Sequence, residues 1–159
     1  MTLARMDDRG DRLVVVNMNA TRRGALSPDL YNAIAQAMQA ADTPRIRAVI
    51  LTSEGGFFCA GGDLNGLIAR RDLPEDSRRA KIEDLHDLVR MIRACPVPVI
   101  AAVEGGAAGA GASLALACDL IVAAEGAKFT AAYVKAGLVP DGGLTSALAR
   151  MLPRPLAME

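Results

Sequence analysis

Two glycine-rich turns, each placed between a strand-like run and a helix, constrain most strongly what this chain can fold into. The first follows the apolar run at residues 47–52 and the second follows the run at residues 98–103. Glycine lets ligand atoms approach the backbone where a side chain would block them. The first N–H groups of a helix have no carbonyl partner within it and lie at the positive end of the helix dipole. Together the two turns can hold an oxygen that gains negative charge, which favours an acyl carbonyl as the ligand.

The composition limits the class of protein. The chain has 159 residues, of which 52% are hydrophobic and none is tryptophan, so we expect one domain with a core of small aliphatic side chains. Its 18 basic and 18 acidic residues balance, so bulk electrostatics favour no nucleic-acid partner. No apolar run approaches the roughly 20 residues of a membrane span, and the N-terminus lacks an apolar signal core. These features predict a soluble cytoplasmic protein with no membrane partner.

The three cysteines are widely spaced and lie in largely apolar runs: Cys59, Cys95 and Cys118. An odd number without a framework spacing predicts reduced, buried thiols. Cys59 lies in the first glycine turn, where a nucleophile is one interpretation. With no histidine nearby in the sequence, a small packing residue is the favoured one.

Hydrophobic periodicity predicts alternating strands and helices. Strands are expected at residues 12–19, 47–52, 99–103 and 119–123, and helices at 28–41, 63–71, 77–94, 110–117 and 144–152. Ser27 should cap the first helix ahead of Pro28, and apolar residues from Ile82 to Ile92 should turn the long helix toward the core. The alternation predicts parallel strands with crossover connections, and the charged residues 70–79 predict a mobile surface loop.

Four segments resemble, in order and spacing, the crotonase (enoyl-CoA hydratase/isomerase) superfamily: residues 23–26, 58–64, 98–119 and 129–143. The resemblance covers about residues 13–159. It implies an α/β fold whose core is a ββα spiral, formed here by residues 1–159 as one crotonase-like domain. Relatives carry a further C-terminal helical region, so the resemblance also implies a core that is incomplete at its C-terminus.

The resemblance implies a coenzyme A thioester as substrate, with no permanently bound cofactor and no metal. The backbone N–H groups of Gly62 and Ala110 correspond to the oxyanion donors, and Ala110 stands where most relatives have glycine. The residues implied to enclose coenzyme A are Arg23, Ala25, Leu26, Ala60, Gly61, Asp63 and Leu64. Arg22 or Arg23 is expected to face a phosphate, or else to be a solvated turn charge.

Two substitutions argue against hydration. Hydratases of this family hold water between two glutamates, and the corresponding positions here carry Ser113 and Tyr133. Without both carboxylates, no evident pair of groups can deprotonate water and protonate the α-carbon. Ser113 and Tyr133 are therefore expected to contact the substrate instead.

Asp141 is the carboxylate that remains. It precedes two glycines and a helix, so a helix cap is one interpretation. The segment 137–143 is also similar to enoyl-CoA isomerases, including the ring-epoxyphenylacetyl-CoA isomerase type. In these the acidic residue reaches into the acyl pocket and shuttles a proton, while two N–H donors stabilise the enolate.

Two other functions stay open. The segment around Asp141 also resembles halobenzoyl-CoA dehalogenases, in which this aspartate is a nucleophile and in which a histidine lies near the position of His86. Against this, aromatic residues are few, and Tyr133 stands where that branch has tryptophan. A coenzyme A-binding protein without hydratase activity is the other alternative.

Residues 114–124 and 144–152 are rich in Ala, Leu and Val. Five helices cannot cover both faces of the expected sheets, so we expect exposed apolar surface that marks an interface. The resemblance implies a homotrimer or a dimer of trimers.

Overall fold

The computed structural model describes residues 2–158 and has the expected mixed α/β architecture. The strands are β1 (Ala4–Asp8), β2 (Arg12–Asn17), β3 (Ala48–Ser53), β4 (Val99–Val103), β5 (Gly106–Ala108), β6 (Leu120–Ala123) and β7 (Lys128–Thr130). The helices are α1 (Pro28–Ala40), α2 (Leu64–Ala69), α3 (Glu75–Arg93), α4 (Ala110–Ala117), α5 (Leu144–Met151) and α6 (Arg154–Met158), with short 3-10 helices η1 (Ala20–Arg22) and η2 (Ala132–Ala136). Across residues 2–158, no helix is both long and apolar enough to cross a membrane.

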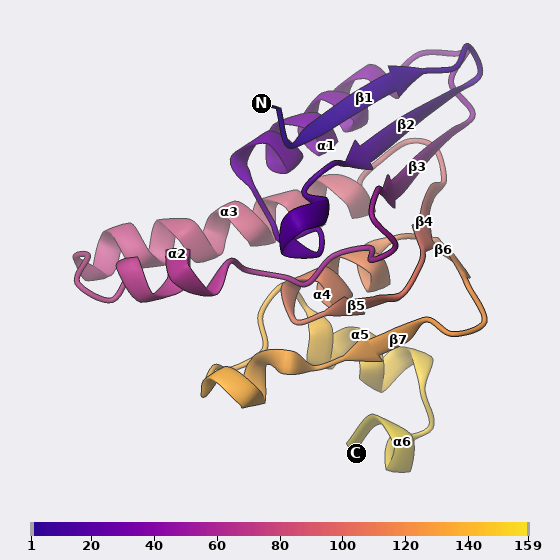
Figure 1. Ribbon diagram of the computed structural model, residues 1–159. Coiled ribbons are helices and arrows are strands. Elements are labelled where there is room, and N and C mark those ends of the chain that lie inside the picture. The colour runs from indigo at the N-terminus through magenta and orange to yellow at the C-terminus, as the bar shows by residue number, and fades with distance from the viewer. Residues whose placement is uncertain (1, 159) are drawn as a thin grey trace.

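The larger sheet has five strands in the order β1-β2-β3-β4-β6 (Figure 1). β1 runs antiparallel to β2, and the other neighbours are parallel, as the alternation of strands and helices predicts. The side chain of Asp119 joins the start of β6 to β4 by accepting a hydrogen bond from the N–H of Val99 at 2.8 Å. A second, two-stranded parallel sheet pairs β5 with β7.

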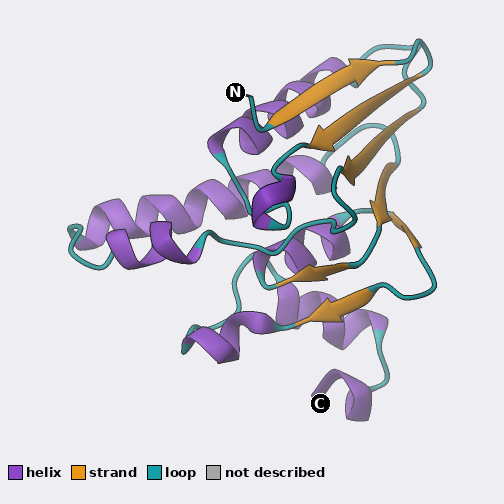
Figure 2. Ribbon diagram, viewed as in Figure 1, coloured by secondary structure: helices purple, strands orange, loops and turns teal. Residues whose placement is uncertain are grey.

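The chain repeats one unit along these sheets, as Figure 2 shows. A strand of the large sheet leads to a short segment near the small sheet, and a helix then returns the chain to the next strand. The units β4-β5-α4 and β6-β7-α5 have this form, and Cys59 makes a single parallel bridge to Ala107 in the unit that begins with β3. This is the ββα spiral that the sequence predicts, and it brings the turns after successive strands together.

Helices α1 and α3 lie on the same side of the large sheet (Figure 1). Alternate residues of the sheet, such as Val49 and Val99, are fully buried. Ser27 caps α1 as expected, because its hydroxyl accepts a hydrogen bond from the N–H of Leu30 at 3.3 Å. The expectation for Ile82 is wrong: its side chain is 46% exposed, because the first half of α3 extends beyond the sheet.

Several elements differ from the expectation. Strands β1, β5 and β7 and helix α6 were not anticipated, since none has a clear apolar period in its sequence. Residues 70–79 are not one loop, because α3 already begins at Glu75 and only the residues before it connect the two helices. Cys59 and Cys118 are buried as expected, whereas Cys95 is half-buried.

Exposed apolar side chains occur on both halves of the chain, and α4 does not present them as expected. Helix α4 is buried almost throughout, because it packs against β5, α3 and α5. On the second half, the exposed residues are instead on β6, around η2 and at the C-terminal end, and include Leu120, Val122, Val134, Val139, Met151 and Leu156. Others lie on α2 and α3 and include Leu64, Ile68 and Ile82.

Candidate active site

The two glycine-rich turns lie against each other. The carbonyl of Cys59 accepts a hydrogen bond from the N–H of Ala108 at 2.9 Å. Gly61 has φ +88°, and a Cβ at this position would lie 2.7 Å from the carbonyl oxygen of Ala108. A Cβ at Gly111 would collide with the Cys59 carbonyl. Only glycine permits this contact, so the spacing of glycines in both turns is required for them to meet.

Two backbone donors face the space beside these turns. Gly62 follows the first turn, and Ala110 is the first residue of α4, whose cap Gly109 has no side chain to occupy the helix N-terminus. Within residues 2–158, the N–H groups of Gly62 and Ala110 donate to no protein acceptor. Both residues line one cavity of about 150 Å³. Two such N–H groups at one cavity could stabilise a developing oxyanion, which is the role that the resemblance implies for them.

The walls of this cavity come from five elements, α1, α2, α3, α4 and η2, and from the segments between them. They include Leu26, Tyr31, Ala60, Leu64, Leu67, Arg70, Lys81, Ile82, Leu85, Tyr133, Leu138 and Asp141. The walls are mostly apolar, which suits an acyl chain. Asp141 is the one carboxylate among these described lining residues.

The side chain of Asp141 is not a helix cap. The cap position of α5 is Gly143, and the N–H of Leu144 is directed to the backbone carbonyl of Asp141, at 3.3 Å. The carboxylate instead accepts a hydrogen bond at Oδ1 from the hydroxyl of Tyr133, with 2.5 Å between the oxygens. Ser113 Oγ lies 3.0 Å from Tyr133 Oη and 3.0 Å from the carbonyl oxygen of Asp141. The structure therefore brings together the three side chains that the sequence singled out for chemistry.

Both tyrosines near the cavity keep their protons at neutral pH. Burial is the main cause that raises the pKa of Tyr133 far above its ordinary value, and the hydrogen bond to Asp141 adds to it. The pKa of Tyr31 rises to about 12, again chiefly through burial; the charge of Arg70 opposes the shift, and that of Asp141 adds to it. Tyr133 is therefore a hydrogen-bond donor to the carboxylate, not an anion beside it.

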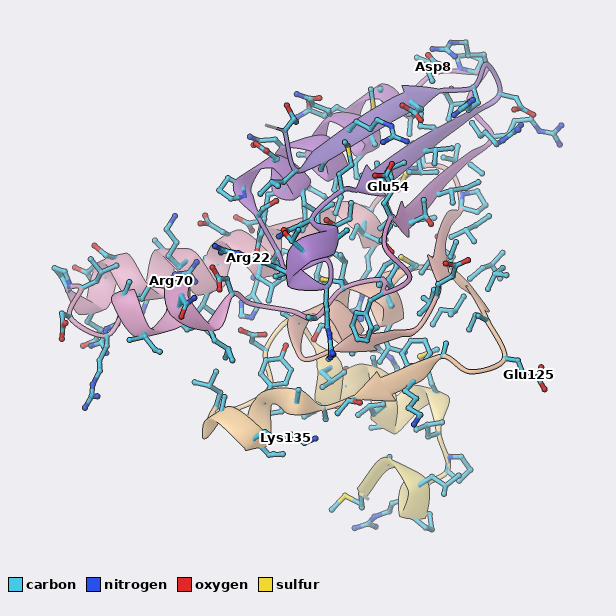
Figure 3. The ribbon with its side chains drawn as sticks, in the orientation of Figure 1. Asp8, Arg22, Glu54, Arg70, Glu125 and Lys135 are labelled. Atoms are coloured by element: carbon cyan, nitrogen blue, oxygen red, sulfur yellow. The ribbon has the colours of Figure 1, made fainter. Side chains whose placement is uncertain are left out.

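A second hollow of about 480 Å³ adjoins the cavity, sharing Ala60, Gly62 and Leu64 with it. Arg22 of η1 and Lys135 of η2, both labelled in Figure 3, are among its lining residues. Arg22 also forms an ion pair with Asp63 at 2.6 Å, and Asp63 caps α2 through its side chain. The hollow therefore has two cations in its wall and reaches the cavity at Gly62.

The segments expected to bind coenzyme A meet as backbone partners. The N–H of Ala60 donates to the carbonyl of Arg23 at 2.9 Å, and the N–H of Leu26 donates to the carbonyl of Gly61 at 2.8 Å. Ala25 lines the second hollow, but the guanidinium of Arg23 lies 5.9 Å from the centre of the Phe57 ring. Arg22, not Arg23, is therefore the arginine of this pair that lines the hollow.

Three cations at these cavities were missed in the sequence. Arg70 and Lys81 line the acyl-sized cavity, and Lys135 lines the hollow beside it. Helices α2 and α3 and the short η2 place them there, and their segments carry no motif that distinguishes them from surface charges. Ser113 is expected from the sequence to contact the substrate. Instead it is only 1% exposed and lies behind the cavity wall.

Two other candidates for chemistry lie apart from the cavity. Burial raises the pKa of the Cys59 thiol to about 12, so it does not supply a thiolate at neutral pH. His86 is half-buried on α3, with its Nδ1 3.5 Å from a carboxylate oxygen of Glu83. Neither residue is among those that line the cavity with Asp141.

Comparison with known proteins agrees with this geometry. Residues 8–159 match the family model described as enoyl-CoA hydratase/isomerase. A probable enoyl-CoA hydratase of Rhodobacter capsulatus is 41% identical over 149 residues, which cover 93% of this chain and 53% of the relative. The 1,2-epoxyphenylacetyl-CoA isomerase of Escherichia coli K12 is 39% identical over 139 residues, covering 86% of this chain and 53% of the relative.

Solved structures give the same result for the fold. A crystal structure of an enoyl-CoA hydratase from Polaromonas sp. JS666 superposes with a TM-score of 0.92 at 48% sequence identity. The alignment covers 98% of this chain and 61% of that one. The fold is thus that of the crotonases, and the chain spans about half the length of the curated relatives it matches.

Proposed function

The chain belongs to the enoyl-CoA hydratase/isomerase family, and from this premise we propose that it moves the double bond of an enoyl-CoA thioester, with Asp141 as the base. The observation that carries the proposal is the cavity that Asp141 shares with the N–H groups of Gly62 and Ala110. One carboxylate and two backbone donors are what a double-bond shift requires.

The reaction conserves atoms and electrons within the substrate. Asp141 removes a proton from one carbon of the acyl chain, and the electron pair moves onto the thioester oxygen as an enolate. The N–H groups of Gly62 and Ala110 stabilise the negative charge on that oxygen. Asp141 then returns the proton to a different carbon, and the double bond has moved.

Isomerisation is proposed over hydration although several similar proteins are named hydratases. Addition of water needs one group to remove a proton from water and another to protonate carbon. Asp141 is the one carboxylate of the described cavity lining, and Ser113 and Tyr133 carry hydroxyls that ordinarily remain protonated. The similarity to the Escherichia coli isomerase agrees with this choice.

The hollow between Arg22 and Lys135 is proposed to hold the coenzyme A part of the substrate. Two cations that line a hollow next to the cavity of Asp141 suit the phosphates of coenzyme A. Ala25, Ala60, Gly62, Asp63 and Leu64 line this channel and are proposed to contact the coenzyme.

We also propose that the protein assembles as a homotrimer or a dimer of trimers in the cytoplasm. The exposed apolar side chains of β6, including Leu120 at 56% and Val122 at 65% exposure, support burial against another subunit.

The proposed reaction is tested with Asp141→Asn. This variant keeps the shape of the side chain but cannot take a proton, so coenzyme A thioesters should still bind while isomerisation is lost. Mass spectrometry and absorbance of the enoyl thioester distinguish isomerisation, which leaves the mass unchanged, from hydration, which adds water. Asp42→Asn is the matched control, because Asp42 is exposed in the turn after α1. A normal turnover rate in Asp141→Asn would contradict the proposed function.

A further inference from the structure

The carboxylate of Asp141 is held on one side only. Its Oδ1 accepts the hydrogen bond from Tyr133 at 2.5 Å. Among residues 2–158, no protein donor reaches Oδ2. The two oxygens of one carboxylate therefore have different surroundings, one anchored in the wall and one available to a ligand.

The ionised carboxylate of Asp141 can only accept hydrogen bonds, whereas each hydroxyl can donate one and accept others. The hydrogen of Tyr133 goes to Oδ1 of Asp141, the shortest of the contacts. The hydrogen of Ser113 is directed to the carbonyl oxygen of Asp141 or to Tyr133 Oη, each at 3.0 Å. Both directions are compatible with the bond from Tyr133 to the carboxylate.

The backbone at Asp141 is fixed by the same serine. Ser113 is 1% exposed, and Tyr133 is 6% exposed. Gly142 has φ +59° and lies so close to the serine that a Cβ at Gly142 would be 2.8 Å from Ser113 Cβ. The turn that carries Asp141 therefore packs directly on α4, the helix whose first N–H is an oxyanion donor.

We propose that Ser113 and Tyr133 are positioning residues that hold Asp141 by its backbone carbonyl and by Oδ1, so that Oδ2 is the oxygen that takes and returns the substrate proton. This inference rests on the proposed isomerase function. It assigns to the two hydroxyls a task different from the substrate contacts expected in the sequence.

The arrangement suits a base that must be unchanged after each cycle. When Oδ2 takes a proton, Oδ1 is still an acceptor, so the bond from Tyr133 persists in both states of Asp141. The carboxylate therefore need not rotate between removing the proton and returning it. Holding a reacting group in its productive geometry is among the larger contributions to catalysis.

The test separates catalysis from binding with Tyr133→Phe, which keeps the packed ring and removes the hydroxyl. A hydrogen bond to a charged group is worth about 1.5–3 kcal/mol, so kcat should fall about 10- to 100-fold while KM changes little. Ser113→Ala should lower kcat in the same direction by a smaller factor. Ser146→Ala is the matched control, because it removes an exposed hydroxyl from α5.

Each outcome decides the inference. A lower kcat with an unchanged KM supports it. If Asp141→Asn is inactive but Tyr133→Phe has the normal kcat, the inference is wrong and the proposed function stands. A higher KM with normal kcat would show that Tyr133 binds substrate, which overturns the inference as well. Turnover by Asp141→Asn, or none by the unmodified protein, overturns both proposals.

Discussion

Returning a glutamate to position 113 should not create a hydratase. The family resemblance implies that Ser113 stands where hydratases have one of their two glutamates, and Ser113→Glu is the simplest way to place a carboxylate there. The side chain would have to extend into space held by the Tyr133 hydroxyl and the Asp141 carbonyl, each 3.0 Å from the serine oxygen. Gly142, in the turn before α5, closes the same space. The space around position 113 therefore fits a serine and has no room for a glutamate.

The cost follows from two effects. Overpacking a filled core costs typically about 1–3 kcal/mol, and leaving a buried polar group without its partner costs about 1–3 kcal/mol more. Together they destabilise the fold by about 2–6 kcal/mol, a large share of the 5–15 kcal/mol that stabilises a typical domain. A second carboxylate beside Asp141 adds repulsion, unless one of the two takes up a proton.

Urea unfolding measures the loss of stability, and mass spectrometry of the acyl-CoA product detects water addition. We expect a lower unfolding midpoint, weaker isomerisation and no gain of the hydrated product. Ser146→Glu, which adds the same group at an exposed position of α5, should change stability by less than about 0.5 kcal/mol. Wild-type stability together with rapid hydration by Ser113→Glu would refute the reasoning, because it would mean that the wall can open around the new side chain.

Two further predictions concern stability and assembly. The hydrogen bond from Arg45 lowers the pKa of Asp8 to about 2. Because this pKa is lower than the value near 4 of the unfolded chain, ionised Asp8 stabilises the fold above about pH 4, and this stabilisation is lost as the pH falls toward 2. Asp8→Asn should therefore flatten the loss of stability over this range in acid titrations followed by circular dichroism. Sedimentation of the natural full-length polypeptide at micromolar concentration should show trimers or hexamers that raised salt does not dissociate, because apolar burial holds them; a stable monomer would contradict this assembly.

The glycine turns and the core could be predicted because their signals are local. The apolar period of α3 correctly identifies Leu85, Leu88 and Ile92 as buried, and it fails only at Ile82, where the helix leaves the sheet. Strand β5 has the sequence Gly-Ala-Ala, which has no strand preference of its own. This segment is a strand because its backbone pairs with β7, and a local sequence pattern could not have predicted that pairing.

The contact between Tyr133 and Asp141 illustrates the same limit within the site. Tyr133 lies within η2, and Gly137, with φ of +66°, lies between it and Asp141 in the chain. Which way each side chain points depends on that turn and on the packing against α4. The sequence therefore identified all three residues of this cluster by their positions, but it did not predict the contacts of Ser113 and Tyr133 with Asp141.

The two halves of the site also differ in how freely they can change. The proposed oxyanion donors are backbone N–H groups, so alanine at position 110 can serve as well as glycine. The proposed base and the two hydroxyls beside it are side chains, and each contacts the others. We therefore expect a change of reaction within this fold to require coordinated substitutions at positions 113, 133 and 141, while the turns after β3 and β4 remain as they are. This separation explains how the chain can share its fold with proteins named hydratases while it carries hydroxyls at positions 113 and 133.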